Sequence, residues 1–240
     1  MSAASATLTR QCSLVAVSHG TNDPAGQRAV SALVAQVRRV ADVQVHQAFV
    51  DVQEPRVGAL LHGLPEGNQS SVLVPLLISR GVHVDQDLTE AAVLRPATRV
   101  AAALGPHKLL AQVIEHRLVQ AGWLPGEPVI LAGAGTRLGQ GTQDCHQAAA
   151  LLAERLGVPV SAAFVAAAEP ALGQAVATAR DAAPQRRVVV ASYLLAPGYF
   201  QSLIERCGAE LVSGPLLAAD EQVPRELVNL VLERFTAACE

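Results

Sequence analysis

Short apolar runs alternate along the chain with longer segments in which apolar residues recur every three or four positions. Cys12–Ser18 and Ser71–Ile78 are nearly continuous apolar runs of strand length, whereas Gln27–Val40 has its apolar residues at helical spacing. Continuous apolar runs are typical of parallel strands, which are buried on both faces of their sheet. The pattern therefore predicts strands that alternate with helices.

The same alternation continues through both halves of the chain. In the first half the predicted strands are Cys12–Ser18, Val43–Val50, Ser71–Ile78 and Thr98–Leu104, and the predicted helices are Gln27–Val40, Pro55–Leu64, Asp87–Arg95 and Pro106–Ala121. In the second half the order repeats with strands Val129–Leu131, Val158–Val165 and Arg187–Leu194 and helices Gln143–Leu156 and Pro170–Arg180. Because crossovers between parallel strands are right-handed, these units predict parallel sheets with helices on both faces.

The two halves also share sequence motifs. Val-Ala-Val-Ser-His-Gly-Thr (15–21) and Ala-Phe-Val-Asp-Val-Gln-Glu-Pro (48–55) recur 115 residues later as Leu-Ala-Gly-Ala-Gly-Thr and Ala-Phe-Val-Ala-Ala-Ala-Glu-Pro, and a third match follows at an offset of 117. In this alignment His19 corresponds to Ala134 and His83 to Phe200. The chain is thus a duplicated unit, and the loss of both histidines from the second copy predicts one active site, carried by the first.

A linker is predicted at Gly122–Glu127, where Pro and Gly lie between the two copies. We expect an α/β protein of two similar lobes, each with a four-stranded parallel sheet and flanking helices. Residues 1–122 are expected to form the N-terminal lobe that carries the histidines, and residues 127–240 the duplicated lobe that lacks them.

Composition narrows the choice of partners. Half of the 240 residues are apolar and the formal net charge is -3, without a run of Lys and Arg that could neutralise phosphates, so no nucleic-acid partner is expected. The longest apolar runs are strand-sized and residues 1–11 contain no apolar core of a signal peptide, which predicts a soluble, cytoplasmic protein without a membrane partner. The four cysteines are too scattered for a metal or iron–sulfur motif and are expected to be free thiols.

Polar side chains follow the first three predicted strands. His19 follows the first strand, Asp51 and Glu54 follow the second, and His83 follows the third. Because ligand sites of open parallel sheets lie at the carboxyl ends of the strands, these residues should meet at one rim. Two imidazoles and a carboxylate suit a divalent metal of intermediate softness, and the carboxylate could also accept protons. Each histidine taken singly has an ordinary alternative as a capping or hydrogen-bonded residue.

Together these motifs resemble the CbiX/SirB family of class II tetrapyrrole chelatases. The resemblance rests on His-Gly-Thr after the first strand, Phe-Val-Asp-x-x-Glu-Pro after the second and Val-Pro-Leu-Leu-Ile-Ser-Arg-Gly-x-His-Val-x-x-Asp after the third, and it extends from Ser13 to the C-terminus. It implies a class II chelatase-like fold of two fused copies. It also implies insertion of Co²⁺ or Fe²⁺, as the metal substrate, into sirohydrochlorin during cobalamin or sirohaem biosynthesis, with no organic cofactor.

The resemblance implies roles for the residues at the rim. His19 and His83 are expected to bind the incoming metal and to assist its delivery or the removal of the pyrrole protons. Asp51 stands where relatives commonly have Glu and is the expected partner carboxylate. Glu54 is a second candidate, but Glu169 repeats it in the copy without histidines, so stabilisation of a helix N-terminus is an equal alternative.

Sirohydrochlorin carries many peripheral carboxylates, which implies that cationic side chains orient it. Arg80 and Arg137 lie in loops beside the expected site, and Tyr199 and Phe200 of the second copy are expected to form a wall against the macrocycle. Solvated arginines and aromatic residues packed in the core are the ordinary alternatives.

Two other functions fit part of the pattern. A His-Gly pair after a first strand is also found in histidine phosphatases, but those have Arg directly before the histidine, where this chain has Ser18. A carrier that binds a metal or a tetrapyrrole without turnover would need the same residues as a chelatase. The choice between Co²⁺ and Fe²⁺ and the oligomeric state stay open, although a monomer could be active because one chain supplies both lobes.

Overall fold

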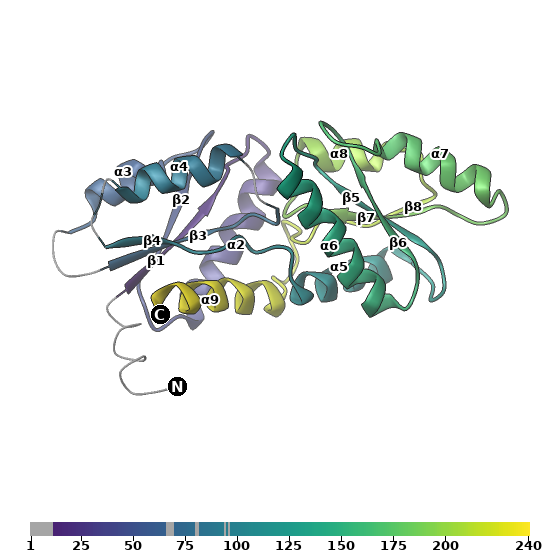
Figure 1. Cartoon of the computed structure of the whole chain (residues 1–240). Coiled ribbons are helices and arrows are strands. Elements are labelled where there is room, and N and C mark those ends of the chain that lie inside the picture. The colour runs from purple at the N-terminus through teal and green to yellow at the C-terminus, as the bar shows by residue number, and fades with distance from the viewer. Residues whose placement is uncertain (1–11, 66–69, 80–81, 94, 96) are drawn as a thin grey trace.

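The computed structural model describes residues 12–65, 70–79, 82–93, 95 and 97–240, and for residues 82–87 it describes the backbone alone. Two lobes lie side by side, each built on a four-stranded parallel sheet with helices on both faces (Figure 1). The strand orders are β2-β1-β3-β4 and β6-β5-β7-β8, so the second sheet repeats the first. This is the α/β fold expected from the sequence.

All of the predicted strands and helices are present, with shifted ends. The first sheet contains β1 (Cys12–Ser18), β2 (Val45–Phe49), β3 (Ser70–Pro75) and β4 (Thr98–Val100), and the helices after these strands are α2 (Pro24–Val40), α3 (Val57–Gly63), α4 (Val82–Val93) and α5 (Lys108–Ala121). The second contains β5 (Val129–Gly133), β6 (Val160–Phe164), β7 (Val189–Tyr193) and β8 (Leu211–Val212), followed by α6 (Gly139–Leu156), α7 (Leu172–Ala182), α8 (Tyr199–Glu205) and α9 (Arg225–Cys239).

The start of α2 shows why such ends shift. The helix begins at Pro24 rather than at the predicted Gln27. The Asp23 carboxylate caps it by accepting hydrogen bonds from the backbone N–H groups of Ala25 (2.8 Å) and Gly26 (3.0 Å). Proline is also favoured in the first turn of a helix, where its missing N–H costs nothing. The residues just before the predicted helix are therefore its capped first turn.

The helices α5 and α9 are exchanged between the lobes. α5 follows the first sheet along the chain but packs against α6, β7 and β8 of the second lobe. α9 ends the second half but packs against α2, β3 and β4 of the first lobe (Figure 1). Each lobe is thus completed by a helix from the other half of the sequence.

One apolar core runs through both lobes and includes the exchanged helices. It contains Leu14 of β1, Leu33 of α2, Leu118 of α5, Leu131 of β5 and Leu230 of α9, each at most 1% exposed. Two smaller clusters lie on the opposite faces of the sheets, under α3 and α4 in the first lobe and under α7 and α8 in the second. Because apolar burial is the main driving force of folding, the shared core makes the two lobes one cooperative unit.

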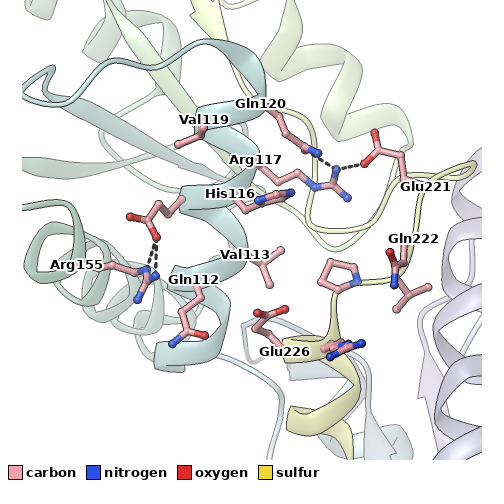
Figure 2. Close-up of a pocket in the computed structure, with 14 residues that line it drawn as sticks. Gln112, Val113, His116, Arg117, Val119, Gln120, Arg155, Glu221, Gln222 and Glu226 are labelled. Atoms are coloured by element: carbon pink, nitrogen blue, oxygen red, sulfur yellow. Dashed lines mark hydrogen bonds and ion pairs between the residues drawn. The ribbon is translucent and has the colours of Figure 1, made fainter.

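Two arginines hold the exchanged helices in place. Arg117 of α5 is 5% exposed and donates hydrogen bonds to the Leu216 carbonyl from Nε (3.3 Å) and Nη2 (3.1 Å), and its Nη1 pairs with Glu221 (Figure 2). Arg234 of α9, which lies 117 residues further along, donates to the carbonyls of residues 103 (2.8 Å) and 104 (3.2 Å). Both accepting segments follow the fourth strand of the receiving sheet. Each arginine therefore fixes its helix to the lobe that the helix completes.

We predict that Arg117→Met lowers the free energy of unfolding by about 1–3 kcal/mol, since it leaves a buried carbonyl without its hydrogen-bond donors. The Leu216 carbonyl would lose both of its Arg117 donors, while the methionine roughly keeps the volume of the side chain. The measurement is urea-induced unfolding. Arg225→Met is the control, because Arg225 is exposed on α9, and its effect should stay within about 0.5 kcal/mol. Equal stability of the two variants would contradict the role given to Arg117.

Candidate functional site

The loops after β1 and β2 bring His19 and Asp51 together. The two strands pair in parallel as far as Ser18 and Phe49, and the contact continues beyond them because the backbone N–H of Asp51 donates to the His19 carbonyl (2.9 Å). Both residues are exposed to solvent. The structure thus places side by side two of the four residues expected at the rim.

Gly20 makes this approach possible. Its φ is +93°, and a Cβ atom at this position would lie 2.1 Å from the Asp51 carbonyl oxygen. Only glycine adopts this left-handed conformation without strain and tolerates so close a backbone. The following Thr21 donates its backbone N–H to Gln53 Oε1 (3.1 Å), so the two loops are also joined beyond the glycine.

The Asp51 carboxylate is held by its own loop. Its Oδ1 accepts hydrogen bonds from the Val52 N–H (2.8 Å) and from Arg56 Nη1 (2.8 Å). The bond from Val52, and next the one from Arg56, lowers the pKa of Asp51; desolvation opposes them, and the charge of His19 adds to the lowering. Asp51 is therefore ionised at neutral pH, which is the state in which a carboxylate binds a metal.

Glu54 and its counterpart Glu169 make the same contact in their respective copies. Glu54 Oε2 accepts a hydrogen bond from the backbone N–H of Arg56 (2.8 Å), and Glu169 Oε2 accepts one from the N–H of Ala171 (2.9 Å) at the corresponding place. Because the second copy has neither histidine, this contact belongs to the turn before the helix. The turn alone therefore accounts for the contact of Glu54.

The third loop leads to Arg80 and His83. Arg80 lies outside the described residues, and His83 is the second residue of α4, where the backbone alone is described. The segment before them is fixed by the second lobe, because Tyr193 Oη donates a hydrogen bond to the Ile78 carbonyl (2.8 Å). Tyr193 belongs to β7 and is 1% exposed, so it packs in the core and anchors this segment.

The two lobes meet beside this rim. The Pro197–Gly198 turn after β7 contacts the first lobe so closely that a Cβ atom on Gly26 would lie 2.5 Å from the Pro197 carbonyl oxygen, and a Cβ on Gly198 3.8 Å from Thr21 Oγ1. Tyr199 and Phe200 come next, as the first residues of α8, and are 70% and 41% exposed. Their rings contact each other edge to face at a centroid distance of 5.7 Å. Arg137, in the loop after β5, is also exposed.

Two polar residues of the rim were not predicted. Arg56 contacts Asp51, and Gln53 contacts Thr21. The repeat contained a signal for both, because the second copy has Ala171 and Ala168 at the corresponding positions. The polar set of the first copy is thus larger than the histidines and carboxylates alone.

A buried carboxylate was also missed. Asp144 of α6 is 4% exposed and accepts a hydrogen bond from Gln140 Nε2 (3.4 Å). Burial, and then the charge of Asp144, raises the pKa of the Cys145 thiol to about 11. Burial, Cys145 and Asp144 in turn raise the pKa of Tyr193. A charged residue on the apolar face of a predicted helix was the available signal, and the structure places its charge near the Tyr193 anchor.

Two hollows in the surface lie elsewhere. One, of about 870 Å³, is bounded by α5 and the segment before α9, and the other, of about 780 Å³, lies between α2 and α9 (Figure 2 shows the first). Of the predicted site residues whose side chains the structure describes, none lines either hollow. In the first, Arg117 pairs with Glu221 and Arg155 with Glu115 (2.6 Å), so these charges join parts of the chain to each other.

The described residues contain neither a cluster of metal-binding side chains nor a helix that could span a membrane. Among their side chains, no three from His, Cys, Asp and Glu gather closely enough to hold a metal ion. Within the same part of the chain, no helix combines the length and hydropathy needed to cross a bilayer.

Comparison with known proteins identifies relatives of both sequence and fold. The family model CbiX matches residues 13–121 and again residues 128–213. SirB from Bacillus subtilis, solved with Fe³⁺, superimposes with a TM-score of 0.75 at 19% identity, over 93% of this chain and 93% of SirB. CbiX, described as the terminal enzyme for the biosynthesis of siroheme in denitrifying bacteria, gives a TM-score of 0.64 at 22% identity, over 92% and 98% of the chains.

A third similar structure is larger. The multi-domain protein DR2241 from Deinococcus radiodurans, described as similar to chelatases with two additional domains, has a TM-score of 0.69 at 17% identity. The match covers 95% of this chain and 55% of that protein. Among curated protein sequences, none matches the chain significantly.

We predict that Gly26→Ala destabilises the protein by about 1–3 kcal/mol, the cost of overpacking a close contact. A helical Gly→Ala change is normally stabilising by up to about 1 kcal/mol, but here the new methyl group would meet the backbone of the opposite lobe. Gly173→Ala in α7 is the control, because its methyl group would meet nothing within 4 Å. In thermal or urea unfolding, Gly26→Ala should lower the stability and Gly173→Ala should raise it. A stabilised Gly26→Ala variant would show that the lobes do not meet at this point.

Proposed function

The chain belongs to the CbiX family, and on that premise we propose that it is a chelatase that inserts a divalent cation, Co²⁺ or Fe²⁺, into sirohydrochlorin. The observation that carries the proposal is the pairing of His19 with Asp51 at the place where the two lobes meet. The corresponding corner of the second copy, formed by the loops after its first two strands, has Ala134 and Ala166 instead. One polar corner in a duplicated fold fits a single metal-transfer site.

The reaction needs a metal ligand that releases its ion. Each metal dication that enters the ring forms bonds to the ring nitrogens and displaces two pyrrole protons. Neutral imidazole binds ions of intermediate softness such as Co²⁺ and Fe²⁺, and a carboxylate offsets their charge. We assign metal binding to His19, His83 and Asp51. Exposure of His19 and Asp51 suits transfer of the ion rather than its retention.

Removal of the pyrrole protons needs a base beside the ring. After the metal has moved to the ring, a freed imidazole can accept a proton, and histidine is the side chain that most often acts as a base near neutral pH. Asp51, with its lowered pKa, stays ionised through this step and stabilises the imidazolium that forms. His19 and His83 are therefore assigned both roles in sequence, first as ligands and then as proton acceptors.

The second lobe supplies contacts for the macrocycle. Tyr199 and Phe200 are exposed beside the junction, where their faces can cover an apolar ring. Arg137 on the loop after β5, and Arg80 between β3 and α4, are assigned to the peripheral carboxylates of the substrate, with which arginine forms bidentate bonds. The Fe³⁺ in the similar SirB structure and the siroheme route of the similar CbiX make Fe²⁺ the first metal to test.

We predict that His19→Ala and His83→Ala each slow metal insertion by roughly 100-fold or more, the usual size of a lost acid–base group. The measurement is the absorption change of sirohydrochlorin mixed anaerobically with Fe²⁺ or Co²⁺, with and without protein. His62→Ala on α3, an exposed histidine of the same lobe, is the control and should keep the rate of the unmodified protein.

The same assay distinguishes the alternatives. A carrier would bind sirohydrochlorin or the metal without accelerating insertion over the spontaneous reaction. A histidine phosphatase would turn over a chromogenic phosphate ester and lose that activity in His19→Ala. Full insertion rate in the variant that lacks both His19 and His83 would defeat the proposed assignment.

A further inference from the structure

The two copies build the same corner of backbone with different side chains. After the first strand and the second strand, the backbone N–H of Asp51 donates to the carbonyl of His19 (2.9 Å), and that of Ala166 donates to the carbonyl of Ala134 (3.0 Å). Val52 and its counterpart Ala167 both have positive φ, at 67° and 57°. The corner therefore forms without any of the polar side chains that the first copy adds.

Arg56 belongs to these added side chains. Its counterpart Ala171 keeps the backbone contact to Glu169 and starts the next helix equally well. A guanidinium is not needed for the local fold, because the second copy has none. Its presence in the same copy as His19 and Asp51 indicates a role in the chemistry of that copy.

Arg56 is placed between two carboxylates. Its Nη1 donates to Asp51 Oδ1 (2.8 Å) and to the Val50 carbonyl (2.9 Å), and its Nε lies 3.4 Å from Glu54 Oε1. Both hydrogen bonds to the Asp51 carboxylate, from Arg56 and from the Val52 N–H, use Oδ1. The other oxygen, Oδ2, has no hydrogen-bond partner among the described residues.

We propose that Arg56 is a positioning residue that fixes Asp51 by Oδ1, leaves Oδ2 for the metal, and weakens the site so that the metal can leave for the ring. The inference rests on the proposed function. Fixing one oxygen orients the ligand, since both donors hold the carboxylate in one rotamer. The permanent charge of the guanidinium also repels a dication bound a few ångströms away, and this repulsion lowers the affinity of the site. A transfer site needs both properties, a defined geometry and loose binding.

The test separates the effect of the Arg56 charge from the effect of its hydrogen bond. Arg56→Gln removes the charge but keeps a hydrogen-bond donor, so we expect it to bind Co²⁺ alone about 10-fold more tightly, because the repulsion is gone. Insertion should become slower, with kcat reduced about 10-fold or more while the KM for sirohydrochlorin is unchanged, because the bound metal is harder to transfer. Titration calorimetry under anaerobic conditions gives the Kd, and the absorption assay gives kcat and KM. Arg56→Lys, which keeps the charge, should restore loose binding and most of the rate.

Controls exclude indirect effects. Arg39→Gln on α2 makes the same change in net charge at an exposed position away from the site, and it should alter neither Kd nor kcat. In the Asp51→Asn background, Arg56→Gln should have little further effect on kcat, since the two residues act through one contact. Tighter metal binding combined with slower insertion cannot result from partial unfolding, which would lower both the affinity for the metal and the insertion rate.

Two outcomes overturn the proposal. Unchanged or weaker Co²⁺ binding in Arg56→Gln, with the unmodified protein active in insertion, would mean that Arg56 does not weaken the site, while the chelatase function stands. An unchanged kcat together with tighter binding would show that release is not limited by this charge. If the unmodified protein does not accelerate insertion, the proposed function fails instead, and the Co²⁺ titrations still decide whether Arg56 controls a metal site.

Discussion

The exchange of α5 and α9 is the constraint on which the rest of the structure depends. Each sheet buries one face under a helix from the opposite half of the chain, so neither lobe has a complete core by itself. Two lobes joined only by a linker would move relative to each other by default. Here the shared core and the contacts of Arg117 and Arg234 hold the two lobes in a fixed arrangement. The rim loops can therefore meet at a fixed distance.

Duplication separates what the fold needs from what the chemistry needs. Gly20 and Gly135 allow the same close approach in the two copies, and Glu54 and Glu169 make the same turn. These residues serve the backbone geometry that the two copies share. The side chains added in the first copy have no structural equivalent in the second, and they lie beside the place where the two lobes meet.

Most of the fold could be predicted from the sequence, because parallel strands and amphipathic helices leave clear patterns. The approach of His19 to Asp51 also followed from the order of strands, since parallel strands end at one edge. The exchange of helices could not be predicted: the apolar face of α5 shows that the helix is buried, and says nothing of which sheet buries it. The contacts of Arg117 could not be predicted for the same reason, since its partners lie about a hundred positions away in sequence.

The exchange also orders the assembly of the molecule in time. α9 is translated after every strand of both sheets, yet it covers β3 and β4 of the first lobe. Until it leaves the ribosome, apolar residues of β3 such as Val74 lack part of their covering. Domains usually fold in the order in which they are synthesised. This chain cannot complete its first lobe before α9 has been synthesised, so part of the first sheet stays uncovered until then.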